Sequence, residues 1–337
     1  MHRSGEQRQS MRICVVGAGS IGGLLAVRLA QSGENVSVIA RGAHLDAIRA
    51  NGLTLLEDGR DPLVARVRAT NALAQAGAQD LVILGMKAHQ VIDVVRDLPA
   101  LFGDNTMVMT AQNGIPWWYF SGHGGTYEGR RLASADPGNV IADHLPVARV
   151  IGSVVYPAAE IVAPGVIKLI EGNRFSLSEI NNEKTPRIEA VSATFTKAGF
   201  RAPVVSDIRA EIWTKLWGNL SFNPISALTH ATLAGICQYP LTRTLAAHMM
   251  REAQMIGEAL GIRFRIPLEK RIAGAEAVGE HKTSMLQDVE AGRVTEIDAL
   301  VGSVIELGEI VGVKAPAISA VYACVKLLEE TLKVQRG

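Results

Sequence analysis

The sequence of 337 residues predicts an α/β domain built on a parallel sheet, followed by an all-α domain. Three observations support this prediction. A short apolar strand ends at a glycine-rich turn that opens a helix. Two further continuous apolar runs, Asp80–Met86 and Thr106–Thr110, are typical of strands buried in a parallel sheet. Beyond Asp207 the strand patterns give way to helical periods, so we place the domain boundary near residue 206.

The first unit of the chain has the order strand, turn, helix, strand. The apolar run Arg12–Val16 stops at a G-x-G-x-x-G pattern, a helical pattern then continues to Gly33, and Val36–Ala40 forms a second strand. In a Rossmann-type unit these glycines allow the tight turn, close approach to a pyrophosphate and close helix packing, while the N–H groups at the helix start face the phosphates. The residues predicted to bind a dinucleotide are Gly17, Gly19, Ser20, Ile21 and Gly22.

The end of the second strand indicates which dinucleotide is bound. Enzymes that use NAD place an acidic residue there for the ribose 2′-hydroxyl, whereas a cation accommodates a 2′-phosphate. This position holds Arg41, 19 residues after Gly22, and no acidic residue precedes Asp46. We therefore expect NADP(H), with a solvated surface arginine as the alternative.

Composition excludes several classes of function. With 34 basic and 33 acidic residues the formal net charge is +1, and without a basic run the chain lacks the signature of a nucleic-acid binder. Three distant cysteines fit a reduced compartment. No run approaches the ~18 apolar residues of a membrane span. We expect a disordered extension over residues 1–10, a cytoplasmic protein, and neither membrane, nucleic-acid nor metal binding.

The rest of the first domain follows the same α/β pattern. Its expected elements, in order, are a helix over Ala43–Asn51, a strand pair within Gly52–Ala69, a helix over Val91–Leu101, strands over Val154–Tyr156, Gly165–Ile170 and Phe175–Leu177 that close a mixed sheet edge, a helix over Pro186–Ala198 and a strand over Pro203–Val205. Ligands of open α/β sheets bind outside the carboxyl ends of the strands. Lys87 and Asn113 follow two such ends, so both are expected near the cofactor.

The stretch from about 117 to 145 loses this regular period. It begins with the aromatic run Trp117–Phe120 and is rich in glycine, which is typical of an insertion in the cofactor domain. Its aromatic residues either anchor the insertion to the sheet, which we favour, or form a wall over the substrate.

The second domain, residues 207–337, is expected to consist of helices. These cover Ile208–Phe222, Leu241–Leu260, Leu268–Val278, Ser284–Ala291, Glu296–Val311 and Ala317–Leu332. Within the first, Glu211, Lys215, Asn219 and Asn223 recur every four residues, and Pro224 is expected to end or kink the helix. A solvated face with a Glu-to-Lys pair would explain the spacing equally well, but asparagine is a poor helix former, so two on one stripe favour fixed hydrogen-bond partners.

A second polar cluster lies between two predicted helices. Ser284–Asp288 is followed by a break and then by Thr295–Asp298. Glu296 would occupy a first helical turn, where the helix dipole favours its carboxylate, and could hold a lysine or a substrate hydroxyl. As an equally weighted alternative, Thr295 and the acids only cap the helix.

Together these blocks resemble the ketopantoate reductase family over about residues 11 to 328. The blocks that carry the resemblance are the glycine loop, Lys87 in Leu-Gly-Met-Lys-Ala, Asn113-Gly114, Arg209–Leu216, Asn219, Asn223-Pro224, Ser284–Asp288 and Thr295–Asp298. The resemblance implies a C-terminal domain like that of 6-phosphogluconate dehydrogenase and the NADPH-dependent reduction of 2-dehydropantoate to pantoate, on the way to pantothenate and coenzyme A. It also allows a homodimer.

The resemblance further implies a role for each matching residue. Lys215 would be the general acid and Glu296 its partner near the substrate hydroxyl. The residues implied to surround the substrate are Asn113, Asn219, Asn223 and Ser284. Lys87 would lie near the nicotinamide ribose, and Asn113 and Glu296 would also contact the cofactor. The insertion near 117–145 and the N-terminal extension depart from compact family members.

Two alternatives remain at this point. One is an NADPH-dependent reductase of a different, bulkier 2-oxo acid, in which the aromatic insertion reshapes the pocket. The other is a redox sensor that binds NADP(H) without turnover. A pure binder would need only the first 115 or so residues, so the retained set around Lys215 speaks against the sensor.

Overall fold

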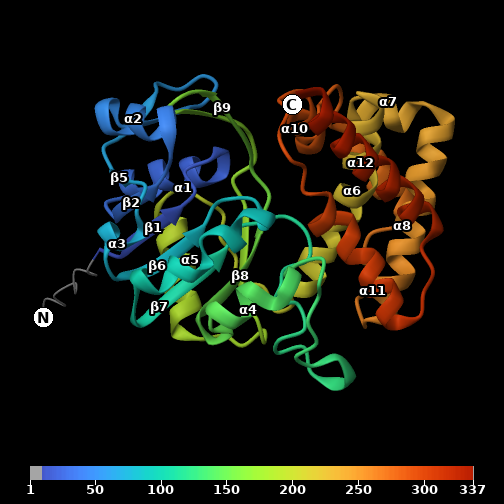
Figure 1. Ribbon diagram of the computed structural model, residues 1–337, viewed down its shortest axis with the longest axis horizontal. Coiled ribbons are helices and arrows are strands. Elements are labelled where there is room, and N and C mark those ends of the chain that lie inside the picture. The colour runs from blue at the N-terminus through green and yellow to red at the C-terminus, as the bar shows by residue number, and fades with distance from the viewer. Residues whose placement is uncertain (1–9, 337) are drawn as a thin grey trace, which may run out of the picture. The chain divides into compact units, whose positions relative to one another are not determined.

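The computed structural model describes residues 10–336, so the expected extension lies, except for Ser10, outside the described residues. Contacts divide the chain into two compact units. The sheet unit comprises 10–86, Gln90–Gln112 and Ile141–Ser206, and the helical unit comprises Lys87–His89, Asn113–Val140 and 207–336. An α/β Rossmann-type domain followed by helices confirms the predicted fold class (Figure 1).

The main sheet of the sheet unit has seven strands in the order β11-β8-β7-β6-β1-β2-β5. Their bounds are β1 Arg12–Val16, β2 Asn35–Ile39, β5 Arg68–Thr70, β6 Gln79–Leu84, β7 Phe102–Thr110, β8 Val150–Val155 and β11 Phe175–Glu179. All neighbours pair in parallel except β11, which runs antiparallel to β8. The interior strand β1 lies between β2 and β6 and is buried from Ile13 to Val16, so the glycine turn starts from a rigid support.

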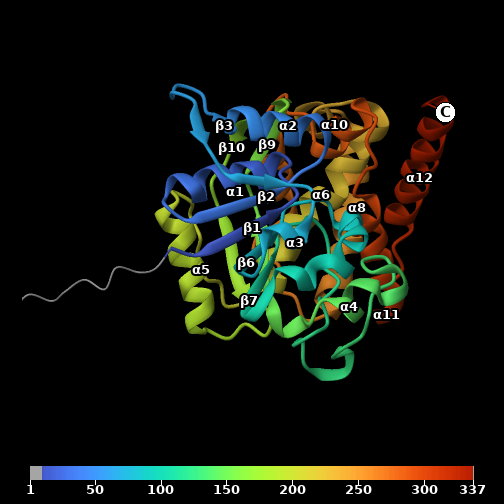
Figure 2. The same cartoon turned by 60° about the vertical axis from the view of Figure 1, so that its left-hand side comes forward.

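A second, four-stranded sheet has the order β4-β3-β10-β9. Its strands are β3 Leu53–Leu56, β4 Leu63–Ala65, β9 Ala158–Ala163 and β10 Val166–Glu171. We expected the strand at Gly165–Ile170 to close the edge of one mixed sheet, whereas β10 pairs in parallel with β3 in this separate sheet. Helix α1 (Ser20–Gln31) packs against β1 and β2 and also against β3, β9 and β10, so each sheet covers part of one apolar helix (Figure 2).

The remaining helices of the sheet unit are short. They are α2 Gly42–Asn51, α3 Leu73–Ala76 and α5 Pro186–Lys197. The expected helix Val91–Leu101 is replaced by two 3₁₀ segments, Ala88–Asp93 and Val95–Leu101; Pro99 cannot donate the N–H that a continuous α-helix requires. The expected strand Pro203–Val205 amounts to an isolated bridge between Val204 and Leu177.

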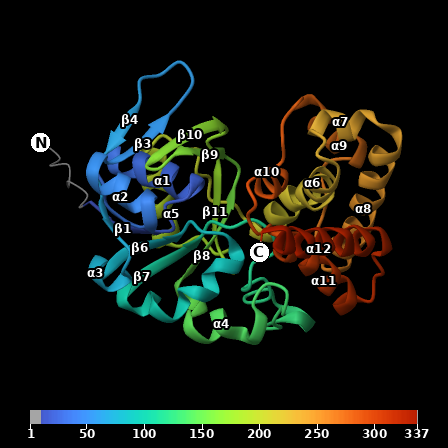
Figure 3. The same ribbon diagram turned by 45° about the horizontal axis from the view of Figure 1, so that its top comes forward.

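The helical unit is organised around the long helix α6, Ile208–Thr229, which packs against α8, α10 and α12 (Figure 3). The other helices are α7 Leu233–Gln238, α8 Pro240–Ala259, α9 Leu268–Ala277, α10 Ser284–Glu290, α11 Ser303–Val311 and α12 Pro316–Arg336. The short α4, Val140–His144, belongs to the sheet unit except for its first residue. None of the helices described in 10–336 combines the length and apolar character that a membrane span requires.

Our expectation that α6 ends near Phe222 is wrong, since the helix continues through Pro224 to Thr229. A proline inside a helix costs about 3 kcal/mol because it removes a hydrogen bond and crowds the preceding turn. Residues Leu220 to Ala227 are all buried, so tertiary packing of this half of α6 offsets that cost. The helix ends instead at His230, which adopts a left-handed backbone conformation.

The aromatic excursion up to Val140 is grouped with the helical unit, whereas we expected the whole of it in the cofactor domain and anchored to the sheet. Trp118, Tyr119 and Phe120 are buried. Arg209 on α6 donates from Nε to the Tyr119 carbonyl over 2.8 Å and from Nη2 to the Ser121 carbonyl over 2.7 Å. Hydrogen bonds and packing to α6 therefore anchor this segment.

Candidate functional site

The glycine loop, which we predicted to hold the phosphates, lies directly before α1 (Ser20–Gln31). A Cβ on Gly22 would collide with the Gly17 carbonyl, so the helix approaches the loop this closely only with glycine. The loop is held on its inner side because the N–H groups of Gly17 and Ala18 both donate to the Ile39 carbonyl at the end of β2, over 3.1 and 3.2 Å. An α-helix leaves its first N–H groups without intrahelical acceptors. Those at Ser20 and Ile21 are therefore available to an anion.

Arg41 follows β2 and is the N-cap residue of α2. Its side chain is exposed. The position matches the one from which a cation reaches an adenosine 2′-phosphate in a Rossmann-type unit.

In the helical unit, three of the predicted residues form one hydrogen-bonded chain. Lys215 Nζ, on the second turn of α6, donates to Asn113 Oδ1 over 2.6 Å. Asn113 Nδ2 in turn donates to Glu296 Oε2 over 3.2 Å. This order fixes the orientation of the amide, since a flipped Asn113 would point its NH₂ group at the ammonium. The alternative of a solvated stripe is therefore insufficient for Lys215.

Burial sets the electrostatics of Lys215. Removal of its amine from water lowers its pKa to about 8, and the negative charge of Glu296 opposes only part of that shift. Near neutral pH the amine is thus mostly protonated, yet it gives up its proton more readily than an exposed lysine. A group with these properties can serve as a general acid.

A backbone hydrogen bond also connects the two segments that carry Asn113 and Glu296. Ile115 N donates to the Ala299 carbonyl over 3.0 Å, and a Cβ on Gly114 would collide with that carbonyl. Ala299 lies in a π-helical turn, Asp298–Gly302, that precedes α11. A π-turn displaces carbonyls from the regular ladder. Here the π-turn directs the Ala299 carbonyl toward the Asn113–Ile115 segment.

Lys87 contacts α10 and the loop that follows it. Its Nζ forms an ion pair with Asp288 Oδ2 on α10 over 2.5 Å and donates to the Val294 carbonyl over 2.8 Å. The next residue, Ala88, donates its N–H to Glu296 Oε1 over 3.4 Å. Lys87 thus binds α10 and the loop after it, while the next residue in the chain contacts Glu296.

The other residues predicted to bind the substrate lie on α6 and α10. Asn219 and Asn223 follow Lys215 at successive turns of α6, half-buried and buried respectively. Ser284 is exposed at the first position of α10, which packs against α6. Glu296 lies just before its helix, where its carbonyl accepts the first helical N–H, that of Leu300, over 3.0 Å. Its side chain points to Asn113, so capping alone does not explain this residue.

Sequence reasoning missed several residues that support the site. Glu329 on α12 accepts hydrogen bonds from the N–H and hydroxyl of Thr295, the residue before Glu296, over 2.9 and 2.7 Å. Asp298 accepts from Tyr322 over 2.6 Å and from Lys326 over 3.0 Å. The acidic residues within Thr295–Asp298 could be recognised in the sequence. The residues of α12 that bind Thr295 and Asp298 lie more than 20 positions away, so no local pattern connects them.

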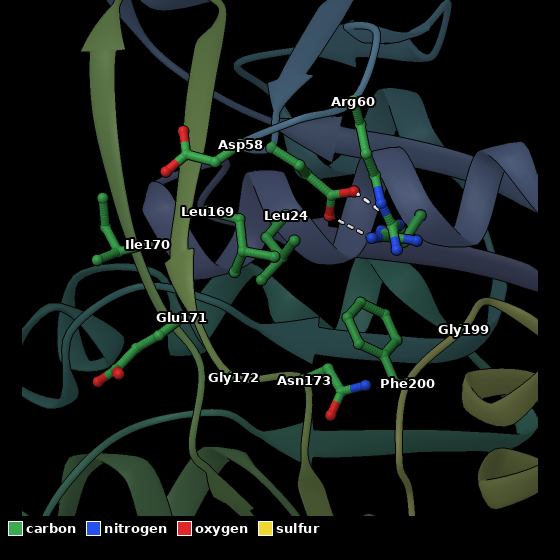
Figure 4. A pocket seen from close by; sticks show the side chains of 12 residues that line it. Leu24, Asp58, Arg60, Leu169, Ile170, Glu171, Gly172, Asn173, Gly199 and Phe200 are labelled. Carbon is green, nitrogen blue, oxygen red and sulfur yellow. Dashed lines mark hydrogen bonds and ion pairs between the residues drawn. The ribbon is translucent and has the colours of Figure 1, made fainter.

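The sheet unit contains a cavity of about 330 Å³ that is lined by residues other than those predicted for the site (Figure 4). Leu24, Leu169 and Phe200 contribute apolar surface, and Glu57 binds the guanidinium groups of Arg28 and Arg60 beside them. None of the predicted site residues lines it. The glycine loop in the sheet unit and the Lys215 chain in the helical unit therefore remain the candidate functional parts, one in each unit.

Comparison with known proteins gives two family matches. The model described as "Ketopantoate reductase PanE/ApbA" matches residues 13–117, and the model described as "Ketopantoate reductase PanE/ApbA C terminal" matches residues 207–329. The first spans the glycine loop, Arg41, Lys87 and Asn113. The second spans α6 and the segment that holds Glu296.

Individual relatives match almost the whole chain. A 2-dehydropantoate 2-reductase of Mesorhizobium japonicum is 55% identical over 97% of this chain and 99% of its own, and one of Pyrococcus horikoshii is 30% identical over 95% and 98%. A putative ketopantoate reductase from Ralstonia solanacearum superimposes with a TM-score of 0.92 at 41% identity, covering 96% of this chain and 99% of its own. D-mandelate dehydrogenase with NADH and anilino(oxo)acetate shares the fold, with a TM-score of 0.82 at 22% identity over 96% and 99% of the two chains.

Proposed function

Because the chain belongs to the ketopantoate reductase family, we propose that it reduces the ketone of 2-dehydropantoate to the alcohol of pantoate with NADPH. The step lies on the way to pantothenate and coenzyme A. The observation that supports the proposal is the Lys215–Asn113–Glu296 chain, in which an amine of lowered pKa is hydrogen-bonded to Asn113 and Asn113 to Glu296.

The glycine cradle and Arg41 fit a phosphorylated dinucleotide. The open N–H groups of α1 suit the pyrophosphate, and the guanidinium of Arg41 suits a 2′-phosphate, to which it can donate charge-assisted hydrogen bonds. Bound NADPH supplies the hydride that reduces the ketone. We assign cofactor binding to the sheet unit and substrate binding to the helical unit, with Lys87, Asn113 and Glu296 also serving the nicotinamide end.

Lys215 is proposed as the general acid. When a hydride reaches the carbonyl carbon, negative charge develops on the oxygen, and a positioned cation that can donate a proton stabilises it. Asn113 Oδ1 holds Nζ in one direction, and Glu296 holds Asn113. The proton lost from Nζ is regained from water after the alcohol leaves.

Asn219, Asn223 and Ser284 are proposed to bind the remainder of the substrate. They offer neutral donors and acceptors along α6 and at the start of α10. Neutral donors suffice for the substrate carboxylate because Lys215 supplies the positive charge. Glu296 is proposed to accept from the substrate hydroxyl with the oxygen that Asn113 does not use.

The test is turnover of NADPH with a panel of 2-oxo acids. The proposal expects kcat/KM for 2-dehydropantoate to exceed the values for smaller and for aromatic 2-oxo acids. A higher value for an aromatic acid would favour the alternative substrate, for which Trp117 is the relevant residue, since it is half-buried and follows Asn113 by four positions. Tight NADPH binding without turnover of any member would favour a sensor.

A further inference from the structure

His44 lies on the first turn of α2 and contacts both the dinucleotide loop and the turn that joins β9 to β10. Its Nε2 is 2.7 Å from the Ala18 carbonyl oxygen. Its Nδ1 is 3.0 Å from the Gly165 backbone nitrogen. One imidazole ring thus connects two segments that are 147 positions apart in the sequence.

Both backbone groups that His44 contacts belong to buried residues. Ala18 is 3% exposed and Gly165 is buried. Buried carbonyl and N–H groups need partners, and an unpaired one costs as much as a lost hydrogen bond or more. His44 provides both partners from one side chain.

The chemistry of the two contacts defines the state of the ring. A backbone N–H can only donate, so Nδ1 of His44 must carry a lone pair. A carbonyl can only accept, so Nε2 must carry the proton. His44 is therefore neutral with its proton on Nε2, and a second proton on the ring would remove the Gly165 contact.

The Ala18 carbonyl is the part of the loop that this bond controls. Ala18 lies between the first two glycines of the cradle, and its N–H already donates to the Ile39 carbonyl. The peptide groups on both sides of Ala18 are thereby fixed, which sets the direction of the backbone that enters α1. The Gly165 carbonyl accepts from Thr54 N over 2.8 Å, so the small sheet holds the other side of the ring.

We propose that His44 is a positioning residue for the dinucleotide, in which a neutral imidazole braced by the β9–β10 turn holds the Ala18 carbonyl and so preorganises the phosphate cradle. This inference rests on the proposed function only in taking a dinucleotide at the loop. It assigns His44 to the pyrophosphate end, which NADPH and NADH share, and Arg41 to the 2′-phosphate end, which only NADPH has.

The experiment measures dissociation constants of NADPH and NADH, kcat, and the thermal midpoint for His44→Ala, His44→Gln and His44→Asn. The glutamine amide can reach the position of Nε2 and donate to Ala18, whereas the shorter asparagine amide reaches only the position of Nδ1. We expect His44→Ala to weaken both cofactors in parallel by about 10-fold, the effect of about one well-placed hydrogen bond. We expect kcat at saturating cofactor to change less than about 2-fold, and glutamine to restore affinity better than asparagine. His248→Gln, at an exposed histidine on α8, is the control.

Three results would overturn the inference. Unchanged affinity in every variant would show that the cradle does not depend on His44. Loss of NADPH affinity alone would place His44 at the 2′-phosphate. Equal losses for glutamine and asparagine that follow the thermal midpoint would indicate a purely structural role. Failure of the unmodified protein to bind NADPH would instead refute the proposed function, so the two failures are distinct.

Discussion

Asn113 and Lys215, 102 positions apart in the sequence, are joined by a 2.6 Å hydrogen bond from Nζ to Oδ1. The bond holds the amine in one direction, and the amide is itself held by Glu296. An amide nitrogen donates and an amide oxygen accepts, so Asn113 can accept from Lys215 and donate to Glu296 at the same time.

Lys215→Ala should leave NADPH binding nearly intact while lowering kcat and kcat/KM together, since the lost interaction forms mainly in the transition state. We expect a loss of about 10² to 10⁴ fold, the usual contribution of one positioned acid. Stopped-flow hydride transfer with 2-dehydropantoate measures it. Lys314→Ala, at an exposed lysine of the same unit, is the control and should retain normal rates. Near-normal transfer in Lys215→Ala would refute the assignment.

The pH dependence of the reduction should report the amine of Lys215. Burial lowers its pKa to about 8, so the protonated form that donates the proton is present below that pH and is lost as the pH rises through it. The value of kcat/KM should therefore fall on the alkaline side with a midpoint near 8. In Lys215→Arg the guanidinium stays charged, so this limb should move to higher pH or vanish even though the rate is lower. A limb unchanged in that variant would assign the titration to another group.

The sequence alone predicted the glycine loop and the Lys215 helix as parts of the candidate site, but not the residues that support them. The glycine loop was predictable because strand, turn and helix follow one another within a local pattern. Lys215, Asn219 and Asn223 lie on successive turns of one helix, as their spacing predicted, although we placed the end of that helix too early because of Pro224. The bond between Lys215 and Asn113 could not be derived from spacing, since it joins elements about 100 positions apart.

The same limit explains the residues that we overlooked. His44 is an unremarkable residue on a short helix, and only the fold brings the β9–β10 turn against it. The aromatic run near Trp118 signalled a buried segment, yet its partner on α6 depends on tertiary packing. Local patterns predicted elements and motifs, whereas long-range hydrogen bonds required the structure.

Arg41→Ala should narrow the preference for NADPH over NADH by weakening NADPH alone. The arginine is exposed at the N-cap of α2, where its guanidinium can bind a 2′-phosphate through charge-assisted hydrogen bonds. Dissociation constants from cofactor fluorescence measure the effect. Arg66→Ala removes an exposed arginine of the same unit and should change neither constant. Equal affinities of the unmodified protein for both cofactors would contradict the prediction.

Gly114→Ala should reduce activity more than a comparable change elsewhere in the helical unit. The added Cβ would collide with the Ala299 carbonyl in the π-turn, which would separate Asn113 from Glu296 and release the amide that holds Lys215. The matched control is Gly125→Ala. Both glycines have positive φ, +91° and +69°, so both substitutions introduce backbone strain of about 1 kcal/mol or more, but nothing lies within 4 Å of a Cβ at Gly125.

Both variants thus introduce the same kind of backbone strain, but only the Cβ at position 114 collides with a neighbouring carbonyl. We expect Gly125→Ala to lower the thermal midpoint slightly and to keep kcat, whereas Gly114→Ala should lower kcat by at least about 10-fold, because a displacement of about 1 Å from a catalytic arrangement can cost 10²-fold. Steady-state kinetics together with thermal unfolding of both variants measure this. Equal kcat in the two variants would show that the contact between Gly114 and Ala299 does not position Asn113.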